Sequence, residues 1–364
     1  MNIEFMRLAL KLSTKGIGYT NPNPLVGAVI VKDNQIIGQG YHKNYGDSHA
    51  EIEALINATE DVSGATMYVT LEPCSHYGNT PPCTEAIISK KISRVIIGMT
   101  DPNPLVSGRG IKLLQDHGIE VTTGILSPEI EKLNEIFIKY ITTSMPFCIM
   151  KTAMSLDGKI STPTGESKWI TGEIARNYVH KIRHQVSAIM VGIGTVLIDN
   201  PSLTTRFPNY HGKDPHRIIL DTKASIPLDA KVLNIESESK TIIATTNKAD
   251  CSKLSKLRDK GAHIIITPLK DGKVDLYSLM TTLGEMKIDS VLLEGGSELN
   301  FSALNENIVD KVITFIAPKI IGGNSSKTPV GGKGIYNLSD AFIQDNISIE
   351  KLGKDIKIES YIRK

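Results

Sequence analysis

Two short segments of the 364-residue sequence carry side chains that could bind and use a metal ion. The first is His49-Ala50-Glu51, and the second contains Cys74, preceded by a proline, and Cys83. Two thiolates and one neutral imidazole can hold Zn²⁺ tetrahedrally and leave one position open for water. Bound zinc lowers the pKa of that water towards about 7, which makes hydroxide available at ordinary pH. We therefore predict that His49, Cys74 and Cys83 bind zinc.

Glu51 is close to the predicted metal but too near His49 in sequence to be a natural fourth ligand. It can carry protons from the water to a departing ammonia, as the glutamate of zinc deaminases does. The usual cysteine spacing is Cys-x-x-Cys, whereas eight residues separate Cys74 from Cys83. His76, inside this long loop, could compete as a ligand. The alternative is that the cysteines are ordinary buried thiols. The combination of His49-Ala50-Glu51 with the two downstream cysteines favours a deaminase site instead.

The elements that must position these residues alternate between helix and strand. Apolar runs predict strands over 26–31, 36–41, 66–71, 94–99 and 119–124, and helices over 5–12, 49–58 and from 83 onward. Both parts of the metal site then lie at helix starts on one edge of a sheet, where ligands commonly bind. Apolar spacing over 127–143 predicts one helix that ends before Pro146, so we place a domain boundary near Ser144.

Two proline-fixed loops in this first part of the chain have similar sequences. Residues 21–26 read Asn-Pro-Asn-Pro-Leu-Val, and residues 101–106 read Asp-Pro-Asn-Pro-Leu-Val. One interpretation is that Asn23 hydrogen-bonds a substrate base. The other is that the prolines only make tight turns.

The second part of the chain has glycine turns after predicted buried strands. We expect strands over 147–154, 186–191 and 290–293, and a helix over 173–184. The turns begin at Gly192-Ile193-Gly194 and at Gly295-Gly296. Backbone amides at such turns can bind phosphate. Two such turns after two buried strands favour a nucleotide cofactor. Leu197 replaces the third glycine of G-x-G-x-x-G, which argues against a standard Rossmann domain.

Composition limits the classes of function. The chain is 40% hydrophobic and 22% charged, and its length suggests two domains. A net charge of +2 gives no basic excess for nucleic acid, and no uncharged apolar run approaches the ~20 residues of a membrane span. The amphipathic N-terminus predicts a core helix, not a signal peptide. Cys148 and Cys251 are most simply free thiols, so we expect a reducing, cytoplasmic compartment.

From about Asn2 to about Leu338 the sequence resembles the bifunctional riboflavin-biosynthesis proteins, in which a pyrimidine deaminase is fused to a reductase. The most specific similarities are the 20–27 loop, His49-Ala50-Glu51, the long cysteine loop, the segment 154–159 and the turn 294–297. The resemblance implies an α/β fold with a cytidine-deaminase-like α/β/α domain, 1–144, and a dihydrofolate-reductase-like α/β domain, 145–364. We also expect a homo-oligomer, dimer or tetramer, formed through the reductase domain.

The family carries out two consecutive reactions. Zinc hydroxide would convert 2,5-diamino-6-(5-phosphoribosylamino)pyrimidin-4(3H)-one to 5-amino-6-(5-phosphoribosylamino)uracil, and NADPH would then reduce the ribosyl group to ribityl. The resemblance assigns zinc binding to His49, Cys74 and Cys83 and the proton shuttle to Glu51. It implies substrate contacts at Asn23, His42, His76, Ser167, Arg183, Leu203, Arg206 and Glu294. It implies cofactor contacts at Ala153, Trp169, Thr195, Asp199, Gly295, Gly296, Ser297, Glu298, Leu299, Asn300, Phe301 and Ser302.

Several assignments keep an alternative. Arg183 and Arg206 fit a phosphate clamp because guanidinium matches phosphate bidentately, but both could be solvated surface residues. Lys151 could polarise the ribose carbonyl or simply form a salt bridge. Position 79, often basic in the family, is Asn79 here, so a cation for the substrate phosphate is missing or supplied from elsewhere. Two other functions remain open, a nucleoside or nucleic-acid deaminase with an unrelated second domain and a binding protein with a structural zinc.

Overall fold

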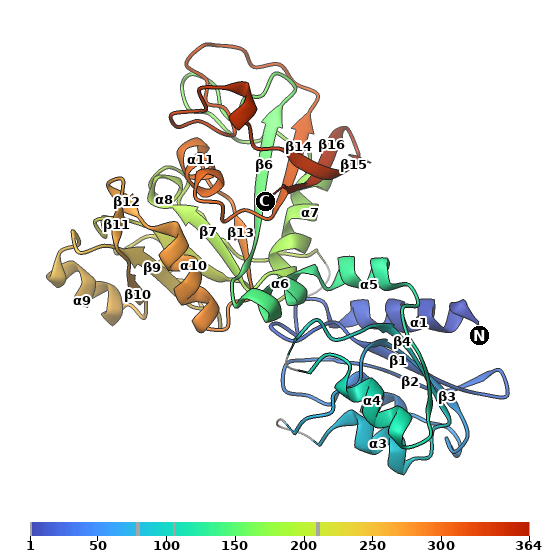
Figure 1. Cartoon of the computed structure of the whole chain (residues 1–364). Helices are drawn as coiled ribbons and strands as arrows, with labels where there is room; N and C mark the ends of the chain where they lie inside the picture. The colour runs from blue at the N-terminus through green and yellow to red at the C-terminus, as the bar shows by residue number, and fades with distance from the viewer. Residues whose placement is uncertain (1, 78–80, 105, 209–211, 364) are drawn as a thin grey trace. The chain divides into compact units, whose positions relative to one another are not determined.

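The structure is a computed structural model that describes residues 2–77, 81–104, 106–208 and 212–363 (Figure 1). Contacts between residues divide it into two compact units, Met1–Ser144 and Met145–Lys364. Asn79 lies outside the described residues. None of the helices in the described ranges is both long enough and apolar enough to cross a membrane.

The first unit is an α/β domain built on a five-stranded sheet in the order β2-β1-β3-β4-β5. Its elements are α1 (Ile3–Ser13), η1 (Thr14–Gly16), β1 (Gly27–Lys32), β2 (Gln35–Tyr41), α2 (Ala50–Ile56), β3 (Thr66–Leu71), α3 (Cys83–Ser89), β4 (Arg94–Met99), α4 (Arg109–Asp116), β5 (Glu120–Thr122), α5 (Ser127–Leu133) and α6 (Glu135–Thr143). The buried residues of α1, α2, α3 and the strands form one apolar core.

The strand directions gather the functional loops at one edge of this sheet. Strands β3, β4 and β5 are parallel, whereas β1 runs antiparallel to both β2 and β3. The segments before β1 and after β2, β3 and β4 therefore all emerge at the same edge. These segments carry Asn23, His42, Cys74 and Asp101, so these side chains all start from one edge of the sheet.

The single helix expected over 127–143 is wrong. Two helices, α5 and α6, meet at Asn134, where φ is −101° and ψ is 18°. The Asn134 side chain accepts from the Leu25 N–H at 2.8 Å and donates to the Leu25 carbonyl at 3.2 Å. This pairing ties the break between the helices to the loop before β1.

The second unit contains a nine-stranded sheet in the order β10-β9-β8-β7-β13-β6-β14-β16-β15 and a small hairpin of β11 and β12. Its elements are β6 (Phe147–Ser155), α7 (Glu173–Gln185), β7 (Ala188–Gly192), α8 (Ile193–Asp199), β8 (His216–Leu220), η2 (Lys231–Leu233), β9 (Thr241–Thr245), α9 (Cys251–Asp259), β10 (His263–Ile266), β11 (Leu269–Lys270), β12 (Lys273–Val274), α10 (Leu276–Glu285), β13 (Ser290–Leu293), α11 (Ser297–Asn305), β14 (Lys311–Ala317), η3 (Leu338–Asp340), β15 (Gln344–Leu352) and β16 (Asp355–Ile362).

Apolar cores cover both faces of this large sheet. Strand β7 alternates between them: Ala188 and Met190 pack in one core with α10 and α11, and Ile189 and Val191 pack in the other with α8 and α9. In the order in which they lie in the sheet, the first seven strands, from β10 to β14, are parallel. Strand β16 is antiparallel to β14, and β15 is antiparallel to β16. The carboxyl ends of β7 and β13 therefore adjoin, beside the middle of the longer strand β6, because Leu293 pairs with both Met190 and Met150. Each of these two strands is followed by a glycine turn.

Candidate functional site

Three side chains in the first unit form a metal-ligand cluster. His49 is the N-cap of α2, Cys83 is the first residue of α3, and Cys74 follows β3. Their ligand atoms all lie within 4.8 Å of one another. His49 Nδ1 is 3.3 Å from Cys83 Sγ and 3.5 Å from Cys74 Sγ. Two such ligands on a tetrahedral zinc ion would lie roughly 3.6 Å apart, so the three residues fit zinc.

The surroundings of Cys74 favour a thiolate. Its Sγ accepts from the Cys83 backbone N–H at 3.3 Å. Hydrogen bonding from Cys83, followed by His49, holds the pKa of the Cys74 thiol well below its usual value. A thiolate is the form that binds zinc. His76 is not part of the ligand cluster in the described part of the chain, so a cage closed by His76 is not found there.

Glu51 lies in the first turn of α2 and is only 3% exposed. Burial, with the nearby Cys74 adding to it, raises the pKa of Glu51 to about 7. An acid–base group works best when its pKa lies near the operating pH. The position and burial of Glu51 therefore suit a proton carrier beside the metal cluster.

A cavity of about 240 Å³ opens beside this cluster. It brings together the predicted residues Asn23, His42, His49, Glu51, Cys74 and His76. Because the Ser48 carbonyl can only accept, His42 Nδ1 donates to it at 3.1 Å, which leaves Nε2 to accept from Asn23 Nδ2 at 3.1 Å. Burial lowers the pKa of His42, which favours this neutral ring. The Asn23 amide is thereby held in one orientation.

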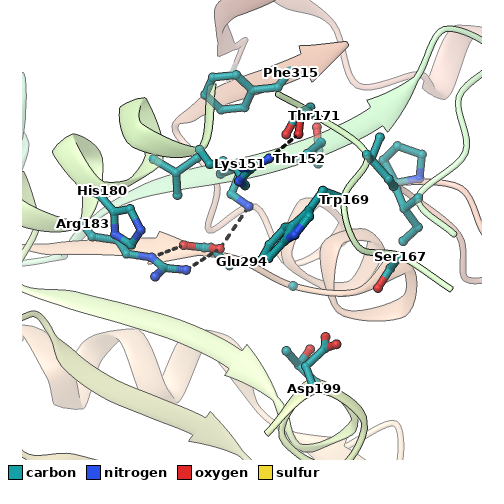
Figure 2. A pocket seen from close by; sticks show the side chains of 18 of the residues that line it. Lys151, Thr152, Ser167, Trp169, Thr171, His180, Arg183, Asp199, Glu294 and Phe315 are labelled. Atoms are coloured by element: carbon teal, nitrogen blue, oxygen red, sulfur yellow. Dashed lines mark hydrogen bonds and ion pairs between the residues drawn. The ribbon is translucent and has the colours of Figure 1, made fainter. Parts of the chain in front are cut away.

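A larger cavity of about 600 Å³ lies in the second unit (Figure 2). Its lining contains most of the residues predicted for the reductase: Lys151, Ala153, Ser167, Trp169, Arg183, Thr195, Asp199, Arg206, Glu294, Gly295, Gly296 and Asn300. Trp169 is 63% exposed, and Arg176 stacks on its ring at 4.7 Å from the centroid. Asp199 pairs with Lys168 at 3.2 Å.

Glu294, directly after β13, is the centre of a buried ion cluster in this cavity. Its Oε2 lies 3.0 Å from Lys151 Nζ, and its two oxygens accept from Arg183 Nε and Nη2 at 2.8 and 3.1 Å (Figure 2). Burial alone would raise the pKa of Glu294, but Arg183 and Lys151 outweigh it and hold that pKa below its usual value. Glu294 is therefore an anion held by two cations.

This cluster bears on two of the open alternatives. Lys151 forms a salt bridge with Glu294 inside the cavity. Arg183 is not a solvated surface residue: its Nε and Nη2 donate to Glu294, and its Nη1 donates to the Thr204 carbonyl. Arg206 makes no such pair with Glu294 among the described contacts and lines the same cavity.

The first glycine turn borders a further cavity of about 720 Å³. Gly192 and Gly194 line it, as do the predicted cofactor residues Glu298, Leu299, Phe301 and Ser302. A Cβ atom built at Gly194 or Gly296 would meet no protein atom within 4 Å, and neither residue has a positive φ. The chain itself does not require glycine there, whereas a ligand lying against the backbone would. The turns therefore fit a bound nucleotide.

Two predicted residues lie elsewhere. Leu203 is 3% exposed and packs in the apolar core with α8, and its side chain is not among those lining the cavities described above. Ser297 begins α11, and its carbonyl accepts from the Gly331 N–H at 3.0 Å. Its side chain is likewise absent from the linings of these cavities.

The cavities also contain residues that sequence reasoning gave no role. Glu72, Asp101 and Asn103 line the first cavity. The repeated Asn-Pro-Asn-Pro and Asp-Pro-Asn-Pro loops were a signal for the latter two, because both loops reach the same cavity. His180 lines the second cavity and accepts from the Arg206 N–H at 3.2 Å. Burial, then Arg183 and Arg206, lowers the pKa of His180 to about 4.

Comparison with known proteins matches both units. Residues 1–99 match the cytidine and deoxycytidylate deaminase zinc-binding region, and residues 146–358 match the RibD C-terminal domain. The riboflavin biosynthesis protein RibD of Actinobacillus pleuropneumoniae is 49% identical over 98% of this chain and 94% of its own length.

Solved structures give the same result. Form 2 of Acinetobacter baumannii RibD is 36% identical, with a TM-score of 0.89 over 99% of this chain and 98% of that one. A Thermotoga maritima diaminohydroxyphosphoribosylaminopyrimidine deaminase/5-amino-6-(5-phosphoribosylamino)uracil reductase is 39% identical, with a TM-score of 0.85 over 99% of this chain and 98% of that one. These matches confirm the predicted family and the α/β fold of both domains. The chain belongs to the RibD family and is a bifunctional enzyme of riboflavin biosynthesis, with a zinc-dependent deaminase domain followed by an NADPH-dependent reductase domain.

Proposed function

We propose that His49, Cys74 and Cys83 hold the zinc of the deaminase and that Glu51 moves the protons. When bound, the ion supplies a water activated at neutral pH, which attacks the carbon bearing the 2-amino group of the diaminopyrimidinone. The Glu51 carboxylate, buried beside the ligand cluster, accepts a proton from the attacking water and delivers one to the departing ammonia. The product is 5-amino-6-(5-phosphoribosylamino)uracil.

Asn23, His42 and His76 act on the substrate side of this reaction. His42 accepts from the Asn23 amide nitrogen, so the Asn23 side chain reaches the cavity with its oxygen available to a pyrimidine N–H. His76 lines the same cavity from the cysteine loop. Fixing an amide in one orientation favours a ring with a complementary donor over an analogue that lacks it.

In the reductase, Lys151 and Glu294 bind the ribosyl group and Arg206 binds the phosphate. NADPH, when bound, supplies the hydride. Lys151 places a positive charge, held 3.0 Å from Glu294, where a ribose oxygen gains negative charge during reduction. Arg183 orients the Glu294 carboxylate through its two hydrogen bonds. The 204–206 segment, which carries Arg206, is fixed by His180 and Arg183.

The cofactor would lie over both glycine turns, because Gly295 and Gly296 line one reductase cavity and Gly192 and Gly194 line the other. Trp169, Ala153, Thr195 and Asp199 would contact it on the side of the Lys151–Glu294 pair. The α11 segment from Ser297 to Ser302 would contact it beyond the turns. The cluster of metal ligands in one unit and the buried ion cluster at a glycine turn in the other together carry this proposal.

The decisive test is to incubate the purified protein with the diaminopyrimidine phosphate, with and without NADPH, and to measure product masses. Without NADPH we expect NH replaced by O, and with NADPH we expect the further addition of hydride and a proton. Removal of the metal by a chelator should abolish the first change and leave reduction of the already deaminated compound intact. Products of free cytidine instead would contradict the proposal.

The protein would act in the cytoplasm on this small molecule and as a homo-oligomer formed through the reductase domain. Strand β15 is the edge of the nine-stranded sheet, and its Ile347 and Ile349 are 61% and 71% exposed. An apolar edge strand is a natural surface for pairing with a second copy. Ile349→Glu should lower the mass measured by light scattering, and an unchanged mass would place the interface elsewhere.

A further inference from the structure

Glu72 is a buried carboxylate that accepts from four backbone N–H groups. It is 5% exposed and lies between the end of β3 and the ligand Cys74. Its Oε2 accepts from Asp101 at 3.1 Å and from Gly108 at 3.0 Å. Its Oε1 accepts from Gly110 at 2.9 Å and from Ile111 at 3.3 Å. The acceptor capacity of one ionised carboxylate is thereby filled by backbone donors from a single segment.

The donors are the two ends of one loop and the first turn of α4. Gly108 is the N-cap of α4 and has no side chain with which to cap it. The first turn of a helix leaves N–H groups unpaired, and a negative charge is favourable there. Glu72, from a distant strand, supplies the missing cap. It also joins Asp101 at the start of the loop to Gly108 at its end.

The loop that Glu72 closes is a wall of the deaminase cavity. Asp101, Asn103 and Val106 line that cavity together with the metal ligands His49 and Cys74. Because Glu72 is two residues from Cys74, one short segment carries both a residue of the metal-ligand cluster and the carboxylate that holds this wall.

We propose that Glu72 is a positioning residue of the deaminase, which fixes Asp101, Asn103 and Val106 of this loop at the distance from the metal that the pyrimidine requires. Glu72 also lines the cavity, but its two carboxylate oxygens are already engaged by the four backbone N–H groups. It acts through the loop, so it determines how well the substrate binds more than how fast the bound substrate reacts. This inference rests on the deaminase activity proposed above.

The test uses Glu72→Gln in the full-length zinc protein. Glutamine keeps the shape but turns one acceptor oxygen into an NH₂ group that faces backbone donors. We expect the KM for the diaminopyrimidine phosphate to rise about tenfold or more, with kcat within a few-fold of wild type, because bonds to a charged acceptor are lost. Zinc content and reduction of the deaminated substrate should be unchanged. Glu60→Gln, an exposed site in the same domain, is the control for charge.

Gly110→Ala tests the same contact from the other side. Its Cβ would lie 2.2 Å from the Pro73 carbonyl, so the start of α4 must move away from Glu72. It should raise KM in the same way with the carboxylate intact. Hydrogen exchange at Gly108 and Gly110 should become faster in Glu72→Gln, a readout that needs no substrate and so separates this inference from the proposed activity. Unchanged KM, unchanged exchange, or loss of zinc in Glu72→Gln would overturn it.

Discussion

Replacing Gly296 by alanine tests directly where the cofactor binds. A Cβ at Gly296 meets no protein atom within 4 Å, and its φ of −80° and ψ of 175° suit alanine. Because Gly296 is the N-cap of α11, the change should cost about 1 kcal/mol of stability. A methyl group forced into a packed ligand contact costs about 1–3 kcal/mol, which corresponds to roughly 5- to 150-fold in Kd.

The assay is a fluorescence titration of NADPH, with thermal unfolding measured in parallel. Gly172→Ala is the matched control, because Gly172 is also an N-cap glycine of this domain, with φ of −72° and ψ of 174°. A Cβ at Gly172 would face Asp355 and not a cavity. We expect weaker NADPH binding in Gly296→Ala alone, and a larger loss in Gly296→Val. Equal Kd values for wild type, Gly296→Ala and Gly296→Val would refute the placement of the cofactor at this turn.

Four further changes test the remaining assignments. Cys83→Ser should lose zinc and deamination together, and full activity in a metal-free variant would contradict the ligand assignment. Glu51→Gln should keep zinc, lose at least about 10²-fold in deamination and still reduce the deaminated substrate; metal loss would make Glu51 a ligand. Glu294→Gln leaves two buried cations without their anion, so ribose reduction should fall while deamination and NADPH binding persist. A serine hydroxyl and then two backbone amides lower the pKa of Asp157 to about 2 in the folded protein. The ionised Asp157 therefore contributes fully to folding stability above its unfolded pKa of about 4, and this contribution is lost as the pH falls through 2. The difference in Tm between wild type and Asp157→Asn should accordingly shrink between about pH 5 and pH 2.

Buried strands were the most predictable elements. Three of them, Thr66–Leu71, Arg94–Met99 and Ser290–Leu293, begin and end at the predicted residues, because continuous apolar runs bounded by polar turns have few other solutions. The break at Asn134 was not predictable from periodicity, since it depends on a contact with Leu25, 109 residues away. Strand β15 was not predicted either, although its Ile347 and Ile349 alternate with polar residues.

The site residues show the same difference between features encoded by a short motif and contacts made between distant residues. The clustering of His49, Cys74 and Cys83 was predictable, because short motifs place each of them at a helix start or after a strand end. The partners of Glu72 lie 29 to 39 residues away, and Glu294 and Arg183 are 111 residues apart. No pattern in one sequence links such residues, so the pairing of Arg183 with Glu294 could not be predicted.

The two buried glutamates of the active sites show why residue type alone did not settle their roles. Burial by itself acts to raise the pKa of both carboxyl groups. Beside Glu51 the next largest influence, Cys74, is a further negative charge, and the pKa reaches about 7, so this carboxylate can gain and lose a proton near neutral pH. Beside Glu294 the next influences are the cations Arg183 and Lys151, which keep it ionised. Glu294 therefore cannot donate the proton that the reduced ribose needs.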